Sequence, residues 1–355
     1  MTYCGLRIEK KSALRIRRSV KREKDALLAE SEIVSVLRKR FGGESFSVVK
    51  GIGDDAAVIR IPGATQYWVL TTDQLHENVH FRREWTGPKQ LGHKALAVNL
   101  SDVAAMGARP RFYVVALAIP RSLPRPWLIG FYEGMVRLGR KHQAILIGGD
   151  LSHSKDGLHI SLAVLGESVR RNALLRCGGK PGDFLYVTGT LGKSAAGLRL
   201  LQAGAQTGKT PSERQALKAH REPEPRCQVG MWLARHGFCR AMMDLSDGLS
   251  LDLLRMCQES GTGAVVHGDR LPLFSRSRAW GCDPIELGLH GGEDYELLFA
   301  VPPRHALSLE SAYPAKYPKI TRIGMLTRSL HMEWIPESNM RPRPLAPCGF
   351  DHFRS

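Results

Sequence analysis

The chain has 355 residues, 43% of them hydrophobic, which is enough for one large or two ordinary domains with real cores. Its apolar runs, such as residues 112–120, are far shorter than the roughly 20 residues that a membrane helix needs, so we expect no membrane partner. The seven cysteines form no CxxC pair, which argues against a disulfide framework or a structural zinc site and favours a reducing, cytoplasmic location.

The net charge of +17 is distributed unevenly. Residues 1–24 hold nine basic side chains and two acidic ones, and we interpret this head as a disordered, solvated tail, with an Arg-rich targeting peptide as the alternative. The remaining net charge suits an enzyme with polyanionic substrates or a nucleic-acid-binding protein. Because no RNA-recognition signature accompanies the charge, we do not expect a nucleic-acid partner.

Residues 51–73 predict two strands separated by a Pro-Gly turn at 62–63. Asp54 and Asp55 come directly before the first strand, and the second is expected to end at the Thr-Thr-Asp sequence of 71–73. Adjacent carboxylates raise each other's pKa unless a positive charge lies between them. The pattern therefore predicts a divalent metal that carries a phosphate.

The next hundred residues predict an α+β unit that ends near residue 166. A helix is predicted over 25–41, before the strand pair. After the strand pair, the pattern predicts two helices, over 90–108 and 127–141, and three strands, over 111–119, 144–147 and 158–165. Asn99 and Asp102 share one face of the first of these helices, where a buried carboxylate needs a cation or solvent. Asp150 follows two glycines where a strand is expected to end, and such glycines let an anion approach the backbone.

A second unit begins with a strand predicted over 184–188, followed by an exposed connection over 203–225. Gly-Lys pairs at 192–193 and 208–209 lack the upstream glycine of a phosphate-binding P-loop. The sequence 244–248, Asp-Leu-Ser-Asp-Gly, stands before an apolar helical pattern and has more polar side chains than helix capping requires.

Six segments in order resemble the thiamine-monophosphate kinase family, which belongs to a superfamily with aminoimidazole ribonucleotide synthetase and selenophosphate synthetase. The resemblance runs from about residue 30 to the C-terminus. Its motifs are Gly-Ile-Gly-Asp-Asp-Ala at 51–56, Thr-Thr-Asp at 71–73, the segment 94–108, Gly-Gly-Asp at 148–150, Asp-Leu-Ser-Asp-Gly at 244–248 and Gly-Gly-Glu-Asp-Tyr-Glu-Leu at 291–297.

The resemblance implies a two-domain α/β (α+β) fold like that of aminoimidazole ribonucleotide synthetase, with ATP between the domains and a homodimer formed through the N-terminal sheet. The expected divisions are the head at 1–24, an ATP- and magnesium-binding domain at 25–166 and a C-terminal domain at 167–355. The matched motif positions imply that several Mg²⁺ ions are held by Asp55, Thr71, Thr72, Asp73, Asp102, Asp150, Asp244 and Asp247. They also imply ATP contacts from Tyr132, Gly149, Asp150, Arg176 and Ser246, and thiamine phosphate contacts from His80, Glu293 and Phe350.

The implied reaction transfers the γ-phosphoryl group of ATP to a phosphate oxygen of thiamine phosphate, giving thiamine diphosphate and ADP. Because the acceptor is already an anion, we assign no general base, and the need is charge neutralisation by hard oxygen ligands with Mg²⁺. Another enzyme of the superfamily stays an alternative, although a selenophosphate synthetase would carry a reactive Cys in a Gly-rich segment and Cys4 has no such setting. A degenerate, non-catalytic relative is the third alternative, but the acidic set is complete.

Overall fold

The computed structural model describes residues 29–43, 45–169 and 173–350, so the predictions for residues 1–24 lie outside the described residues. The chain divides into two compact units, residues 43–350 and a smaller one of residues 1–42 with 351–355. In the smaller unit, helix α2 spans Glu30–Phe41. This confirms that part of the helix predicted over 25–41. Three basic residues in the last turn suit the negative end of the helix dipole.

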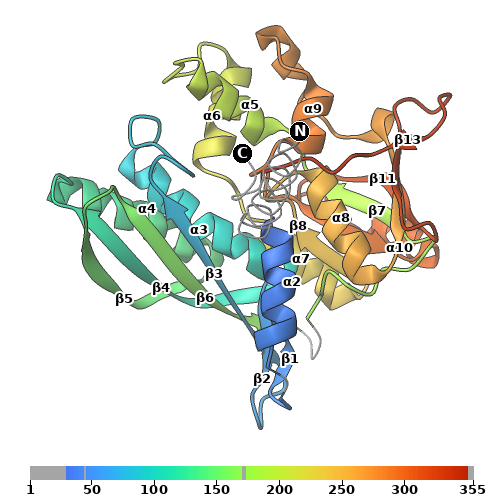
Figure 1. The fold of residues 1–355 in the computed structure, drawn as a ribbon, viewed down its shortest axis with the longest axis horizontal. Coiled ribbons are helices and arrows are strands. Elements are labelled where there is room, and N and C mark those ends of the chain that lie inside the picture. Colours follow the sequence, from blue (N-terminus) through green and yellow to red (C-terminus); the bar gives the residue numbers. More distant parts are fainter. Residues whose placement is uncertain (1–28, 44, 170–172, 351–355) are drawn as a thin grey trace, which may run out of the picture. The chain divides into compact units, whose positions relative to one another are not determined.

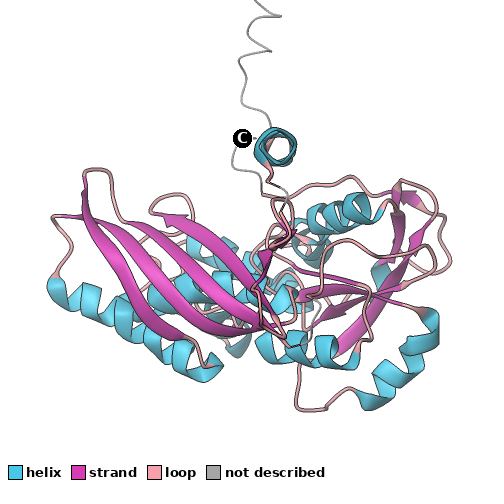
Figure 2. Cartoon of the chain, turned by 90° about the horizontal axis from the view of Figure 1, so that it is seen from below, coloured by secondary structure: helices cyan, strands magenta, loops and turns pink. Residues whose placement is uncertain are grey.

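The first half of the larger unit is a six-stranded sheet with the strand order β1-β2-β3-β6-β4-β5. Neighbouring strands are antiparallel except for β4 and β5, which are parallel. Helices α3 (Pro88–Ala105) and α4 (Arg125–His142) lie along one face of this sheet (Figures 1 and 2). The strands are β1 (Val48–Lys50), β2 (Ala57–Arg60), β3 (Tyr67–His76), β4 (Ala108–Pro120), β5 (Ile145–Ser154) and β6 (His159–Ser168).

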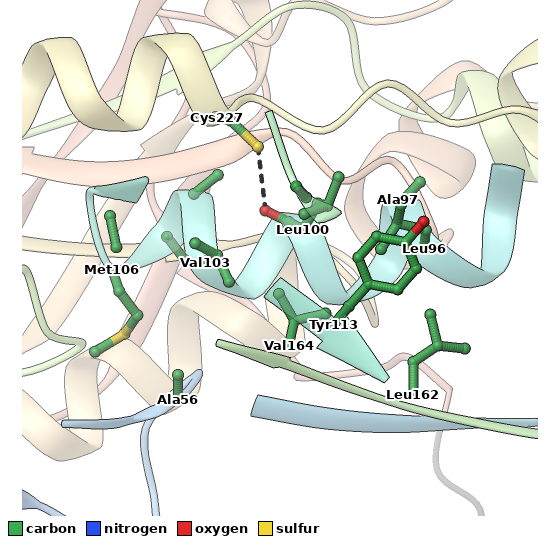
Figure 3. Close-up of a cluster of buried hydrophobic side chains, with 14 of the residues drawn as sticks. Ala56, Leu96, Ala97, Leu100, Val103, Met106, Tyr113, Leu162, Val164 and Cys227 are labelled. Atoms are coloured by element: carbon green, nitrogen blue, oxygen red, sulfur yellow. Dashed lines mark hydrogen bonds between the residues drawn. The ribbon is translucent and has the colours of Figure 1, made fainter. Parts of the chain in front are cut away.

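Helix α3 is the centre of the core because 14 of its 18 residues are buried, and most of those are small or apolar. Glycines allow α3 and α4 to approach closely: a Cβ at Gly92 would lie 1.9 Å from the carbonyl oxygen of Phe131. Figure 3 shows Leu96, Leu100 and Val103 of α3 among the side chains that pack with strand residues such as Val164. This packing fixes the position of α3 on the sheet, and so the backbone positions from which its polar side chains project.

The second half of the larger unit contains a seven-stranded sheet in the order β13-β12-β9-β11-β7-β10-β8. Its strands are β7 (Phe184–Thr188), β8 (Ala241–Asp244), β9 (Gly263–His267), β10 (Leu297–Val301), β11 (Ile320–Thr327), β12 (Met332–Ile335) and β13 (Arg343–Pro344). Its helices are α5 (Lys193–Gln202), α6 (Pro211–Arg221), α7 (Cys227–His236), α8 (Leu249–Ser260), α9 (Pro284–His290) and α10 (Pro303–Ala312), with 3-10 turns at Gly268–Arg270 and Ser275–Trp280. The α/β fold class with two sheets is thereby confirmed.

Two of the predicted strand ends are wrong. Strand β3 continues past Asp73 to His76, because each of its residues from Trp68 onward pairs with a residue of β6. Strand β5 likewise continues through Asp150 to Ser154, paired along one side with β4. These aspartates therefore lie inside strands, where alternation of the side chains decides which face each one occupies.

The predicted connection over 203–225 is also corrected, because it contains α6. The hydroxyl of Thr210 accepts a hydrogen bond from the backbone N–H of Glu213, 3.2 Å away, and the Glu213 carboxylate accepts the N–H of Thr210 in return. The sequence Thr-Pro-Ser-Glu at 210–213 is typical of such a capping box and predicts the start of a helix.

Among the helices of the described residues, none combines the length and the apolar character that crossing a bilayer requires.

Candidate active site

Three carboxylates converge from separate elements of the larger unit. Asp55 precedes β2, Asp102 lies on α3, and Asp244 is the last residue of β8. One oxygen from each of the three lies within 4.8 Å of the others. The site therefore joins the two sheets of the unit, because Asp102 packs with the first and Asp244 ends a strand of the second.

Neighbouring polar groups orient these carboxylates. The hydroxyl of Thr71 donates to Asp102 Oδ2 at 2.6 Å, and that of Ser101 donates to Asp244 Oδ2 at 2.6 Å. Asp73 is held at its backbone, where its N–H donates to Asn99 Oδ1 at 3.1 Å. Thr71 and Asp73 share the face of β3 that bears α3, as expected for residues two apart on a strand.

The cluster concentrates negative charge in a buried place. Burial is the largest cause that raises the pKa of Asp102 well above its usual value, and the carboxylates of Asp73, Asp244 and Asp55 add to it. The pKa of Asp244 is raised for the same reasons, burial first and Asp55 second. All of these groups become easier to ionise when a cation lies among them.

Arg176 is the cation that the structure itself provides. Its Nε and Nη2 donate to Asp55 Oδ1 at 3.0 and 2.6 Å. Among the described residues nothing donates a hydrogen bond to the other oxygen, Oδ2, although that atom is buried. A buried carboxylate oxygen without a donor, next to two more carboxylates, fits a divalent cation with hard oxygen ligands.

Asp54 contacts different groups from those that Asp55 contacts. Its carboxylate accepts the backbone N–H of Arg176 at 3.1 Å and lies 3.4 Å from Lys50 Nζ. Burial, followed by the charge of Asp55, raises the pKa of Asp54 to about 6. Asp54 thus fixes the segment that carries Arg176.

Thr72 and Asp150 are placed apart from the three-carboxylate cluster. The register pairs Thr72 with Ala163, and the Thr72 hydroxyl donates to the carbonyl oxygen of Leu162 at 2.8 Å. Alternation puts Thr72 on the sheet face opposite to Thr71, and Asp150 is an exposed residue of the edge strand β5. Gly149 packs directly on β4, where a Cβ would lie 1.9 Å from the carbonyl oxygen of Val115.

The loop after β8 is held by a carboxylate that the sequence analysis did not select. Asp252, in the first turn of α8, accepts the backbone N–H groups of Ser246, Asp247 and Gly248 at 3.0–3.2 Å. Arg255 Nη1 lies 2.5 Å from Asp247 Oδ2 and 2.8 Å from Asp252 Oδ1. The only signal for Asp252 was an acidic residue in the first turn of a helix.

The loop before β10 sends successive side chains in different directions. Glu293 forms an ion pair with Lys94 and a polar contact with His220, whose pKa is lowered by burial and then by Lys94, and Glu296 forms a bidentate pair with Arg226 at 2.6 and 2.5 Å. Between them, the buried phenol of Tyr295 has its pKa raised by burial and then by carboxylates that include Glu293, Asp73, Asp244 and Asp247. Tyr295 is therefore within electrostatic reach of both Glu293 and the acidic cluster.

Two of the three residues predicted to contact thiamine phosphate lie together. The rings of His80 and Phe350 are 6.5 Å apart between centroids, in an edge-on arrangement. The backbone N–H of Phe350 donates to the carbonyl oxygen of Asp247 at 3.4 Å. Tyr132, predicted to contact ATP, lies on α4 with its ring edge-on to Phe131, at 5.7 Å.

Asp294 gives a stability test that is independent of the acidic cluster. It accepts the N–H groups of Gly192 and Ser194 at the start of α5, and burial raises its pKa to about 7. The folded protein therefore holds the proton of the Asp294 carboxyl group more tightly than the unfolded chain does. The contribution of this proton to the free energy of unfolding is complete below about pH 4 and is lost as the pH rises through 7. Between pH 5 and 8, the unfolding free energy of Asp294→Asn should therefore rise relative to wild type by about 3 kcal/mol. Denaturant unfolding at both pH values measures the change, and a constant difference would contradict it.

Comparison with known proteins places the chain in a family. The model of the AIR synthase related protein N-terminal domain matches residues 53–168, and that of the C-terminal domain matches residues 180–333. The chain therefore belongs to the AIR synthase related proteins, a class that the two-sheet fold and the acidic site between its halves also fit.

Curated relatives narrow the assignment. The thiamine-monophosphate kinase of Bacillus subtilis is 35% identical over 87% of this chain and 94% of its own, and that of Escherichia coli K12 is 36% identical over 91% and 98%. The solved structure of AaThiL complexed with AMPPCP and TMP covers 92% of this chain and 97% of its own, with a TM-score of 0.79 and 31% identity. The chain belongs to the thiamine-monophosphate kinase family.

Proposed function

We propose that this chain is a thiamine-phosphate kinase, which transfers the γ-phosphoryl group of ATP to thiamine phosphate and forms thiamine diphosphate and ADP. The observation that carries the proposal is the buried convergence of Asp55, Asp102 and Asp244 in a member of this kinase family. The relative AaThiL was solved with AMPPCP and TMP, which supports ATP and thiamine phosphate as the two substrates.

The donor set favours Mg²⁺ as the cation of this site. Asp55, Asp102 and Asp244 would hold it directly, with Asp73 and Thr71 beside them. Asp247 is proposed as a further ligand from its motif position, whereas Thr72 and Asp150, which lie apart from this cluster, are proposed as ligands of other ions of the set. When bound, Mg²⁺ neutralises phosphate charge so that two polyanions can meet.

The chain's own residues would then position the substrates. Arg176 and Ser246, together with Gly149 and Tyr132, are proposed to contact ATP, and His80, Phe350 and Glu293 are proposed to contact thiamine phosphate. The guanidinium of Arg176 supplies a fixed positive charge beside the acidic cluster, suited to a phosphate oxygen. His80 and Phe350 together offer aromatic surface for the rings of thiamine phosphate.

A coupled ADP-release assay with ATP and Mg²⁺ tests the function. We expect ADP release with thiamine phosphate and much less with unphosphorylated thiamine, because the acceptor is a phosphate oxygen. ADP release with free thiamine alone would refute the substrate assignment, and no release with either would refute the kinase assignment.

We also propose the domain limits 25–166 and 167–355, after a basic head at 1–24, together with a cytoplasmic location. The division of the strands supports the boundary, because the first sheet ends with β6 at Ser168 and the second begins with β7 at Phe184.

A homodimer is proposed through the sheet face opposite α3. The register places a row of apolar side chains on this face, and Leu70, Val114 and Ile145 are exposed. Exposed apolar side chains of adjacent strands are typical of a surface that a second copy covers.

Ile145 is 58% exposed on this face. Ile145→Glu should convert the dimer to a monomer, because it places a charge in the interface. Sedimentation velocity measures the change. Leu307→Glu is the matched control, because Leu307 is 82% exposed on α10, far along the chain from this sheet. An equal loss of dimer in both variants, or in neither, would contradict the assignment of the interface.

A further inference from the structure

A buried network of polar side chains surrounds Glu293. Lys94 Nζ lies 2.7 Å from Glu293 Oε1, and His220 Nδ1 lies 3.0 Å from Glu293 Oε2. Lys94 comes from α3 and His220 from α6, whereas Glu293 lies in the loop before β10. Each carboxylate oxygen thus has its own partner, and the partners come from both halves of the unit.

The burial of the three side chains is unequal. The Lys94 side chain is 2% exposed and that of His220 is 5% exposed, but 25% of the Glu293 side chain remains exposed. Burial alone would raise the pKa of Glu293, but Lys94, followed by His220, outweighs it and holds that pKa well below the usual value. The carboxylate therefore stays ionised, supported from its buried side and open on another.

The backbone also restrains Glu293. Its φ angle is 65°, in the left-handed region that residues other than glycine seldom adopt. Its N–H donates to the carbonyl oxygen of Ser246 at 2.6 Å, which ties it to the loop that carries Asp247. An uncommon backbone conformation held in this way, with both carboxylate oxygens paired, defines one direction for the side chain.

Ser194, His220 and Glu293 do not have the geometry of a catalytic triad with a serine nucleophile. Ser194 Oγ lies 3.2 Å from His220, but it contacts Nδ1, the same nitrogen that faces Glu293. A triad needs the two ring nitrogens of the histidine to face different partners. The network is therefore suited to holding a carboxylate and not to activating the Ser194 hydroxyl.

We propose that Lys94 and His220 are positioning residues that fix the Glu293 carboxylate for contact with the nitrogen-bearing rings of thiamine phosphate, an inference that rests on the proposed function. The substrate carries a cationic thiazolium and an aminopyrimidine, and an ionised carboxylate attracts the cation and can accept an N–H of the amino group. Lys94 and Ser101 are seven positions apart on α3, so the helix presents both on one face. The same rigid helix then orients the substrate through Glu293 and the acidic cluster through Ser101 and Asp102.

Steady-state kinetics of Lys94→Met tests the proposal. We expect the KM for thiamine phosphate to rise at least tenfold, while the KM for ATP stays within twofold, because a loosened Glu293 affects one substrate. Lys89→Met is the matched control: Lys89 lies on the same helix in an exposed pair with Glu133, and all constants should stay within twofold. A folded Lys94→Met enzyme with an unchanged KM for thiamine phosphate, or with both KM values raised equally, would overturn the proposal.

Substitutions of His220 provide a second test, in which Glu293 keeps its ion pair with Lys94. His220→Asn keeps an N–H donor near the position of Nδ1 and should retain the wild-type KM for thiamine phosphate within threefold, whereas His220→Leu should raise it at least fivefold. Equal constants for these two variants would overturn the role of His220. In a Glu293→Gln background the effect of Lys94→Met should shrink, since Lys94 acts through that carboxylate. Absence of wild-type turnover on thiamine phosphate would instead refute the proposed function.

Discussion

Replacing Asp102 with Asn is expected to reduce turnover by about 10³-fold or more while the fold remains intact. Asp102 is half-buried beside Asp55, Asp73 and Asp244, where its negative charge is favourable only when a cation lies among the carboxylates. Asn keeps the shape of the side chain but removes a hard anionic ligand and part of the charge that would hold Mg²⁺. The measurement is ADP release at saturating ATP, thiamine phosphate and Mg²⁺.

The stability of the same variant distinguishes a lost ligand from a damaged fold. In EDTA, Asp102→Asn should be at least as stable as wild type, because it removes the cost of burying a charge and the repulsion by neighbouring carboxylates, which together raise the pKa of Asp102. Addition of Mg²⁺ without nucleotide should raise the Tm of wild type more than that of the variant. Asp156→Asn, at an exposed turn of the same half, is the control with normal activity. Near-normal turnover of Asp102→Asn would refute its assignment as a ligand.

Three of the predicted ligands, Asp55, Asp102 and Asp244, converge in the fold, but the sequence placed several site residues less well. Asp244 was expected only before an apolar helical pattern, and it is the last residue of β8, ahead of α8. Asp73 and Asp150 were expected at strand ends, but backbone pairing with β6 and β4 carries both strands further. Strand ends depend on how far the neighbouring strand continues, and that information is distant in the sequence.

The supporting residues were harder to predict because their roles depend on contacts between elements far apart in the chain. Ser101 faces Asp244 and Lys94 faces Glu293, across 143 residues in the first pair. From the sequence alone, Ser101 is one small residue on an Ala-rich helix, and Lys94 is a basic residue with no marked context. Helix α6, which brings His220 to Glu293, had a readable capping signal in Thr210 and Glu213, so that omission was avoidable.

Arg176→Met is expected to lower kcat/KM for ATP by about 10²-fold or more, because it removes a fixed positive charge beside the acidic cluster. It should also destabilise the metal-free protein by about 3–5 kcal/mol, since the buried Asp55 carboxylate loses both N–H donors that Arg176 gives to its Oδ1. Denaturant unfolding in EDTA measures the second effect separately from activity.

Mg²⁺ should offset that loss more than it stabilises wild type. In wild type the guanidinium of Arg176 already neutralises Asp55, so a cation at the cluster competes with an existing ion pair. In Arg176→Met all of the Asp55 charge is available, and the Tm should rise more steeply with Mg²⁺ concentration. Arg240→Met is the matched control: it breaks the pair of Arg240 with Asp183, 3.3 Å apart and outside the acidic cluster. This control should lose stability without gaining any additional response to Mg²⁺, and an equal response in the two variants would contradict Asp55 as a ligand.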